Sequence, residues 1–160
     1  IDFLCTNSNE SASARARTVP PGQPIDYMQR SGVGHTKNLG DRGEAIAAAY
    51  LQEKNYRLLE HQFRFHRSDI DLICYDPADQ RSEHGALVFV EVKTRRTYRF
   101  GRPEEAVTAD KQRRIIRAAW GYLHERGYED APCRFDVVAI TLVNGRAPEV
   151  EHFKDAFWPR

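Results

Sequence analysis

The chain has 160 residues, a length that suits one domain with a single core, and 41% of its residues are hydrophobic. Its formal net charge is only +1, so overall charge indicates no nucleic-acid partner and basic patches have to be sought locally. The three cysteines are widely spaced and no apolar run approaches the roughly 20 residues of a membrane helix, which excludes a disulfide framework and predicts a soluble, cytoplasmic protein without a membrane partner.

The first 37 residues predict a flexible tail. They include "NSNESASARARTVPPGQP" and show no apolar period of 2 or 3.6, so they contribute little to a core. The only methionine, Met28, lies just before the first strongly patterned segment, and we expect it to be the natural start of the protein. The folded domain is expected to span residues 38–160.

A helix and three strands are predicted after the tail. Helical spacing of apolar and small residues is seen in "NLGDRGEAIAAAYLQEKN", where Asn38 or Asp41 could cap the start and the helix ends near Asn55. Aromatic and branched residues that partly alternate indicate strands in "YRLLEHQFRF", "DIDLICY" and "ALVFVEVK". Because these strands are consecutive, we expect a meander.

A second helix and a fourth strand are predicted after a basic loop. One apolar stripe runs through "TADKQRRIIRAAWGYLHERG", with Thr108 as the expected N-cap and Gly127 as the C-terminal stop. A buried strand is predicted by "RFDVVAITL", a tight hairpin turn by Asn144 and Gly145, and a short returning strand by "EVEHF". The predicted order is therefore helix, three strands, helix and strand, with a small addition at the end.

Two carboxylates and a lysine are expected to meet on strands that are otherwise apolar. Because side chains alternate across a strand, Glu91 and Lys93 project from the same face. On the preceding strand Asp69, Asp71 and Ile73 are expected to share one face, with the residues between them on the other. Asp71 then becomes a neighbour of Glu91 if the two strands pair.

These side chains predict metal-dependent phosphodiester hydrolysis. Two nearby carboxylates repel each other unless a cation lies between them, and Mg²⁺ or Mn²⁺ suits their hard oxygen atoms. Asp71 and Glu91 would be the metal ligands, and Lys93 would orient the attacking water or stabilise the developing charge. The alternative is that Glu91 and Lys93 form an ordinary ion pair at a strand end and that Asp71 caps a turn.

Two further acidic residues have a structural alternative. Glu44 lies among small residues of the first helix and would reach the metal or its water if that helix packs on the sheet. Otherwise Glu44 would be a solvated glutamate paired with a base such as Arg42. Asp136, which opens the last predicted strand, is expected to be a structural partner of a basic side chain rather than a catalyst.

The segment from Lys93 to Arg117 is a candidate nucleic-acid surface. It contains nine Lys and Arg residues against three acidic ones, with aromatic residues interleaved. Arginine matches phosphate oxygens and aromatic rings stack on unpaired bases, although a solvated helix face is the alternative for part of the segment. The residues expected to hold the nucleic-acid backbone are Arg95, Arg96, Arg99, Lys111 and Arg114.

The chain resembles the YraN-like family of uncharacterised bacterial proteins in four ordered segments, "GDRGEAIAAAYL", "DIDLI", "FVEVKTR" and "RFDVVAI". That family is grouped with the PD-(D/E)XK restriction-endonuclease-like superfamily and is similar to Holliday-junction resolvases. The resemblance implies an α/β fold with an αβββαβ core, a mixed sheet flanked by helices. It also implies Asp71 and Glu91 as metal ligands, Lys93 as the lysine of the signature, and Glu44 as the helix glutamate near the metal. In one departure, the chain has "SDID" where the family usually has GEID.

Three functions follow from these observations. The leading hypothesis is an Mg²⁺- or Mn²⁺-dependent DNA endonuclease, with branched or damaged DNA as candidate substrates and a homodimer as the candidate assembly. The second is a non-catalytic nucleic-acid-binding module of the same fold. The third is a protein-interaction role with a vestigial site, against which the intact Asp71, Glu91 and Lys93 argue.

Overall fold

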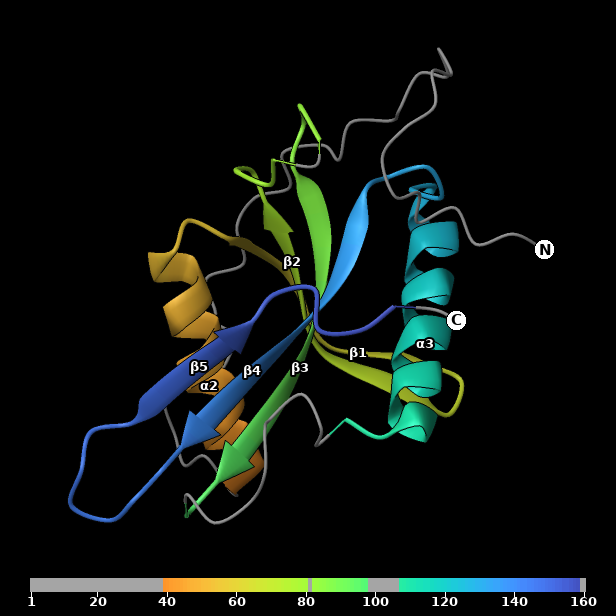
Figure 1. Cartoon of the computed structure of the whole chain (residues 1–160). Helices are drawn as coiled ribbons and strands as arrows, with labels where there is room; N and C mark the ends of the chain where they lie inside the picture. The colour runs from red at the N-terminus through yellow and green to blue at the C-terminus, as the bar shows by residue number, and fades with distance from the viewer. Residues whose placement is uncertain (1–38, 81, 98–106, 159–160) are drawn as a thin grey trace.

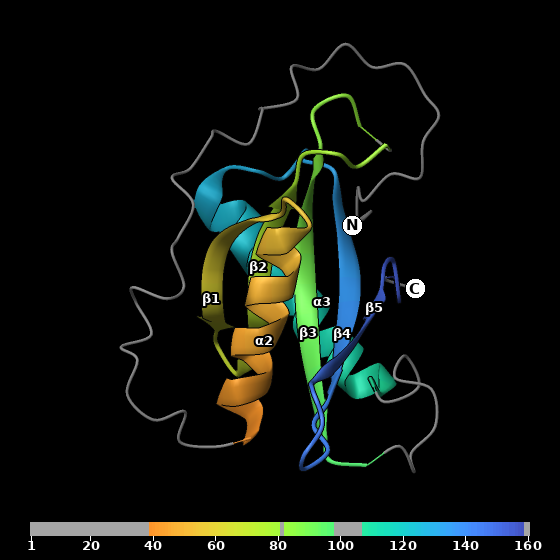
Figure 2. The same ribbon diagram turned by 90° about the vertical axis from the view of Figure 1, so that its left-hand side faces the viewer.

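Two helices pack against opposite faces of a five-stranded sheet, as Figure 1 and Figure 2 show. The computed structural model describes residues 39–80, 82–97 and 107–158, so the predicted tail and the Asn38 cap lie outside the described residues. The elements are α2 (Leu39–Glu53), β1 (Arg57–Phe65), β2 (Ser68–Asp76), β3 (Ala86–Arg95), α3 (Ala109–Arg126), β4 (Cys133–Thr141) and β5 (Glu149–Phe153). The predicted αβββαβ order is confirmed, with β5 as the C-terminal addition.

The sheet is mixed. Its strand order is β1-β2-β3-β4-β5, and the first three strands form the predicted antiparallel meander. β3 and β4 are parallel, and the connection between them carries α3 across one face of the sheet. β5 returns antiparallel to β4. The turn at Asn144 and Gly145 is present, but the connection spans residues 142–148 and is longer than the predicted tight hairpin. The backbone N–H of Leu142 donates to the Arg95 carbonyl of β3 at 2.7 Å.

Each face of the sheet has its own hydrophobic core. Val88 and Val90 face α2, whereas Leu87 and Phe89 face α3. This alternation along β3 was predicted from the spacing of its apolar residues. The two cores explain why β3 carries a nearly continuous apolar run, since a strand covered by a helix on each face is buried on both sides.

The predicted alternation is wrong at one point of β2. Ile70 belongs to the α3-side core together with Ile73, while Leu72 lies in the α2-side core. The pairing of β1 with β2 skips Gln62 and Asp71, and Gln62 has a positive φ of 50°. A strand that is locally irregular cannot keep the period of two, so Ile70 changes face.

Helix α2 approaches the sheet closely. Gly43, Ala47, Ala48 and Leu51 are its buried residues. A Cβ at Gly43 would clash with the side chain of Thr94 on β3, so only glycine fits there without a shift of either element. This contact brings the next residue, Glu44, close to the end of β3.

Helix α3 begins and ends where the sequence predicts. The Thr108 hydroxyl accepts a hydrogen bond from the backbone N–H of Lys111 at 3.3 Å, and Gly127 has a left-handed φ of 66° at the C-terminus. None of the described helices has both the length and the apolar character that crossing a membrane requires. The N-cap places the first turn of α3, and with it Lys111, at the end of β3.

Candidate metal centre

Asp71 on β2 and Glu91 on β3 meet where the regular pairing of their strands ends. The last pair in the β2–β3 register is Leu72 with Val90. Beyond it, the backbone N–H of Val92 donates to Asp71 Oδ2 at 2.7 Å, so a carboxylate takes the place of a backbone carbonyl. This bond fixes the Asp71 side chain beside the strand that carries Glu91.

Glu91 lies between two ammonium groups although it is only 3% exposed. Lys93 Nζ donates to Glu91 Oε1 at 2.7 Å, so the predicted proximity of these two side chains is found. Lys111 Nζ lies 3.2 Å from Glu91 Oε2. That second contact is an ion pair by distance, but Oε2 has no hydrogen bond of acceptable geometry among the described residues. One oxygen of a buried carboxylate is therefore held by charge alone.

Lys111 also reaches Asp69, the residue at which the chain departs from the usual family pattern. Its Nζ lies 3.3 Å from Asp69 Oδ1. Burial alone would lower the pKa of Lys111, but the carboxylates of Glu91, Asp69 and Asp71 outweigh burial and raise it above its ordinary value. Lys111 is thus a permanently charged member of the site, although the sequence predicted it only as a contact to the nucleic-acid backbone.

Asp71 is the acid of this site whose charged form is disfavoured. Burial and the neighbouring Glu91 carboxylate raise the pKa of Asp71 to about 7, against the Val92 N–H, which lowers it. The Glu44 carboxylate raises this pKa further and Lys111 lowers it. These effects connect residues of α2, β2, β3 and α3 in one electrostatic site.

Glu44 is held by side chains of β1 rather than by Arg42. Its Oε2 lies 2.8 Å from His61 Nε2 and accepts a hydrogen bond from Gln62 Nε2 at 3.1 Å. The positive φ of Gln62 is unusual for a residue with a side chain and costs on the order of 1 kcal/mol or more. The irregular backbone therefore lies directly beside the candidate centre.

The predicted nucleic-acid contacts divide into two groups. Lys111 lies inside the carboxylate site, whereas Arg95 and Arg96 continue from β3 toward solvent. Arg114 is exposed on α3 and pairs with Asp110 at 3.1 Å. Arg99 lies outside the described residues.

The side chains fit a divalent cation held by two protein ligands. Glu91 has a buried oxygen that lacks a hydrogen bond, and the raised pKa of Asp71 reflects crowded negative charge. No group of three or more His, Cys, Asp and Glu side chains in the described ranges is arranged to hold a metal ion. The remaining ligands would come from water and phosphate, as is usual for Mg²⁺.

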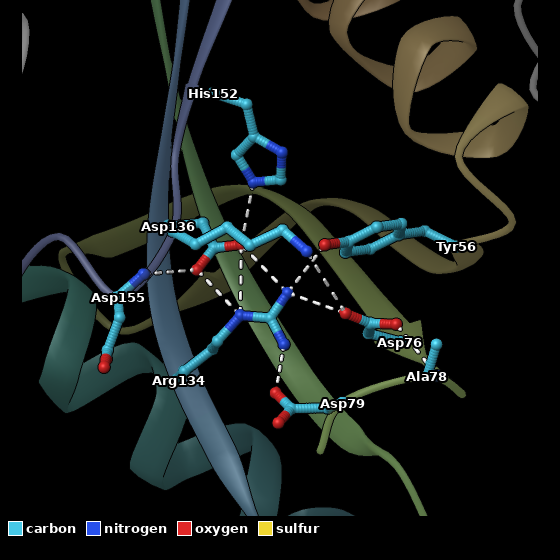
Figure 3. Close-up of polar contacts among 9 residues, drawn as sticks. Tyr56, Asp76, Ala78, Asp79, Arg134, Asp136, His152 and Asp155 are labelled. Carbon is cyan, nitrogen blue, oxygen red and sulfur yellow. Dashed lines mark hydrogen bonds and ion pairs between the residues drawn. The ribbon is translucent and has the colours of Figure 1, made fainter. Parts of the chain in front are cut away.

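Asp136 belongs to a separate buried cluster around Arg134, drawn in Figure 3. Arg134 Nε donates to Asp136 Oδ1 at 3.0 Å, and its NH2 group donates to Asp76 at 3.0 Å and to the Tyr56 hydroxyl at 2.8 Å. His152 Nε2 lies 2.8 Å from Asp136 Oδ2. Burial alone would raise the pKa of Asp136, but His152 and Arg134 hold it below its ordinary value. The predicted structural role of Asp136 is confirmed, with Arg134 as its basic partner.

Comparisons with known proteins give one consistent match. The family model described as uncharacterised protein family UPF0102 matches residues 43–140. A UPF0102 protein of Geobacter sulfurreducens is 45% identical over 126 residues, which cover 79% of this chain and 93% of the relative. A UPF0102 protein of Geotalea daltonii is 44% identical over 130 residues, covering 81% and 97%. One of Chlorobium phaeobacteroides is 42% identical over 124 residues, covering 74% and 92%.

Proposed function

We propose that this chain, which belongs to the uncharacterised protein family UPF0102, the YraN family, is a divalent-metal-dependent endonuclease that hydrolyses phosphodiester bonds in DNA. One observation carries the proposal. Asp71 and Glu91 are brought together at the point where β2 and β3 stop pairing, and lysines of β3 and α3 lie against Glu91. Two acids and two ammonium groups at one position suit a reaction in which negative charge develops on phosphate.

Asp71 and Glu91 would hold Mg²⁺ or Mn²⁺. When bound, such an ion acidifies water and neutralises charge on a phosphate oxygen. The free protein already compensates the charge of Glu91 with Lys93 and Lys111. Lys111 is partly exposed and sits on a flexible stem, so we expect its ammonium group to exchange Glu91 for a phosphate oxygen of the substrate.

Lys93 and Glu44 would act on the attacking water. The ammonium group of Lys93 is held 2.7 Å from Glu91 and can donate to the nucleophile or to the oxygen on which charge develops. Glu44 is fixed by His61 and Gln62 and can accept a hydrogen bond from the same water. Water attacks phosphorus and loses a proton to a carboxylate of the site, while the bond from phosphorus to the leaving oxygen breaks and that oxygen takes up a proton from solvent.

The substrate would be held by the basic residues around the centre. Arg95, Arg96 and Arg114 supply guanidinium groups, with Arg99 as a further candidate outside the described residues. Guanidinium groups match phosphate oxygens in pairs, which fixes a strand without selecting its sequence. Cleavage of both strands would need two such centres and therefore a homodimer.

The proposal is tested by incubating the purified chain with four-way junction, flap, single-stranded and duplex DNA in the presence of Mg²⁺ or Mn²⁺. We expect cleavage of at least one substrate, and Glu91→Ala should abolish it. Glu53→Ala is a matched control, because Glu53 is an exposed glutamate at the end of α2. Absence of cleavage on the whole panel with both metals overturns the proposal.

A second candidate is a non-catalytic DNA-binding module. It is favoured by the absence of a third acidic ligand among the described residues and by the pairing of Glu91 with two ammonium groups. In that case DNA binding survives both EDTA and Glu91→Ala while no cleavage occurs. Its affinity should still fall steeply with salt, by about 0.9 log unit per tenfold change for each phosphate contacted on duplex DNA.

A further inference from the structure

The outward face of α3 carries a stripe of basic and aromatic side chains. Arg113, Arg117, Trp120 and His124 are spaced by four, three and four residues, which places them along one line of the helix. The opposite face packs against the sheet with the α3-side core. We call these four residues the outer stripe.

Trp120 is the most unusual member of the outer stripe. It is 52% exposed, and it is the only large hydrophobic side chain that is exposed in the described parts of the chain. Its indole ring lies nearly parallel to the His124 imidazole, with planes 9° apart and centroids 6.0 Å apart. The stacking restrains the indole, so less conformational entropy would be lost when a second flat group binds.

The outer stripe is also positively charged. Arg117 is exposed and has no ion-pair partner among the described residues. Arg113 is 69% exposed, and it shares the carboxylate of Asp110 with Arg114. At the other end of the outer stripe, His124 Nδ1 lies 3.1 Å from Glu129 Oε1. Three guanidinium groups and one carboxylate therefore leave a positive excess at the start of α3. Such an excess suits a polyanion with flat, apolar groups.

Helix α3 connects the outer stripe to the candidate metal centre. Its first turn supplies Lys111 to Glu91, and Arg113 follows two residues later. With a rise of 1.5 Å per residue, Trp120 lies about 10 Å beyond Arg113 along the helix axis. A strand that leaves the centre over the start of α3 can therefore reach Trp120.

We propose that the outer stripe binds an unpaired DNA strand that flanks the cleaved bond, with a base on Trp120 and phosphates on Arg113 and Arg117. The inference rests on the proposed function for its choice of DNA, and it adds the substrate class. Because bases within a duplex already stack on each other, only an unpaired base can offer a free face to the indole. The substrate is therefore DNA with a single-stranded arm, such as a flap or a splayed junction, rather than continuous duplex.

The test is equilibrium binding of oligothymidine to the whole chain in EDTA. Binding is measured by the quenching of tryptophan fluorescence. The sequence has only two tryptophans, Trp120 and Trp158. We expect oligothymidine to quench the fluorescence of the wild type and of Trp158→Phe, but not that of Trp120→Phe. Trp120→Ala should weaken binding by roughly fivefold to a hundredfold, whereas Trp120→Phe keeps a stacking ring and should lose less.

Two charge variants distinguish binding at the outer stripe from nonspecific attraction of DNA to any exposed arginine of α3. Arg117→Gln should reduce the salt slope of oligothymidine binding by about 0.7, the value for one phosphate contact on a single strand. Arg126→Gln is the matched control and should leave the slope unchanged, because Arg126 is also an exposed arginine of α3 but pairs with Glu60 of β1.

Three results would overturn the inference: oligothymidine binding that does not depend on Trp120, equal affinity for blunt duplex, or a dimer in sedimentation that Trp120→Ala dissociates. The last result would assign the outer stripe to a second copy of the chain. Failure of the proposed function is a different outcome. If Trp120-dependent binding occurs and no substrate is cut, only the nuclease proposal fails, and if cleavage is independent of Trp120, only the outer stripe fails.

Discussion

The Asp71 carboxylate of β2 accepts a hydrogen bond from the backbone N–H of Val92 at 2.7 Å, one pair beyond the end of the regular β2–β3 ladder. This bond satisfies a strand amide that has lost its backbone partner, and it also holds Asp71 near enough to Glu91 for the two carboxylates to repel each other. The contact therefore has a structural and an electrostatic effect. The electrostatic repulsion should lower the free energy of unfolding of the protein.

The first prediction concerns Asp71→Asn and pH. The pKa of Asp71 is raised to about 7 in the folded protein from an ordinary value of 3.8, so its ionisation destabilises the fold as pH rises between these values. Asparagine keeps an oxygen for the Val92 N–H but does not ionise. The free energy of unfolding of Asp71→Asn should exceed that of the wild type at pH 8, by on the order of 1 to 4 kcal/mol.

Urea unfolding measures this difference. The gap between Asp71→Asn and the wild type should narrow as pH falls toward 4, where Asp71 is protonated in the folded chain. Asp130→Asn is a control at an exposed acid and should show no such dependence. A variant less stable than the wild type at pH 8 would mean that the Asp71 charge is well compensated.

The second prediction concerns Lys111→Gln and metal affinity. The substitution removes an ammonium group that lies 3.2 Å from Glu91 and 3.3 Å from Asp69, so the potential of the site becomes more negative. Mn²⁺ binding, measured by electron paramagnetic resonance without DNA, should tighten by roughly fivefold, since one partly exposed ion pair contributes about 1 kcal/mol. Arg114→Gln removes a charge from the same turn and should leave the affinity unchanged. Weaker Mn²⁺ binding by Lys111→Gln would contradict this picture.

The third prediction concerns the contact of α2 with β3. Alanine forms helix better than glycine by about 1 kcal/mol, yet Gly43→Ala should destabilise the protein by roughly 1 to 3 kcal/mol, because the new Cβ clashes with Thr94. Thermal unfolding checks the sign. The double variant Gly43→Ala/Thr94→Ala should recover part of the loss, and a loss that Thr94→Ala does not relieve would refute the steric cause.

The fourth prediction concerns the buried cluster of Figure 3. Arg134 is the common partner of Asp76, Asp79 and Asp136. Arg134→Ala would leave these carboxylates buried without their shared cation and should cost roughly 3 to 5 kcal/mol of unfolding free energy. Arg126→Ala, at an exposed arginine, should cost much less. Similar losses for both variants would show that the cluster is not a main source of stability.

The order of elements and the main carboxylates could be predicted because they depend on short-range pattern. Alternation along β3 places Glu91 with Lys93, and the consecutive strands bring Asp71 beside them. The same alternation failed for Ile70, because the irregularity opposite Gln62 is a backbone event that residue spacing does not encode.

Partners that come from distant segments could not be predicted. Lys111 follows Asp69 by 42 positions and reaches it only because α3 begins at the end of the sheet. His61 contacts Glu44 because α2 packs on β1 and β2, and no spacing of residues in the sequence indicates this contact. Asp136 was expected to have a basic partner, but the strand pattern does not indicate that Arg134 is buried. The burial of Arg134 depends on side chains from other segments that surround it.

The central claim is that Asp71 and Glu91 share a divalent cation, and the most direct measurement is anomalous scattering from a crystal soaked in Mn²⁺. We expect an anomalous peak between the two carboxylates, with Lys111 Nζ withdrawn from Glu91 Oε2. A crystal without a peak there, in which Lys93 and Lys111 remain paired with Glu91, would show that the site is an ion-pair network and not a metal centre.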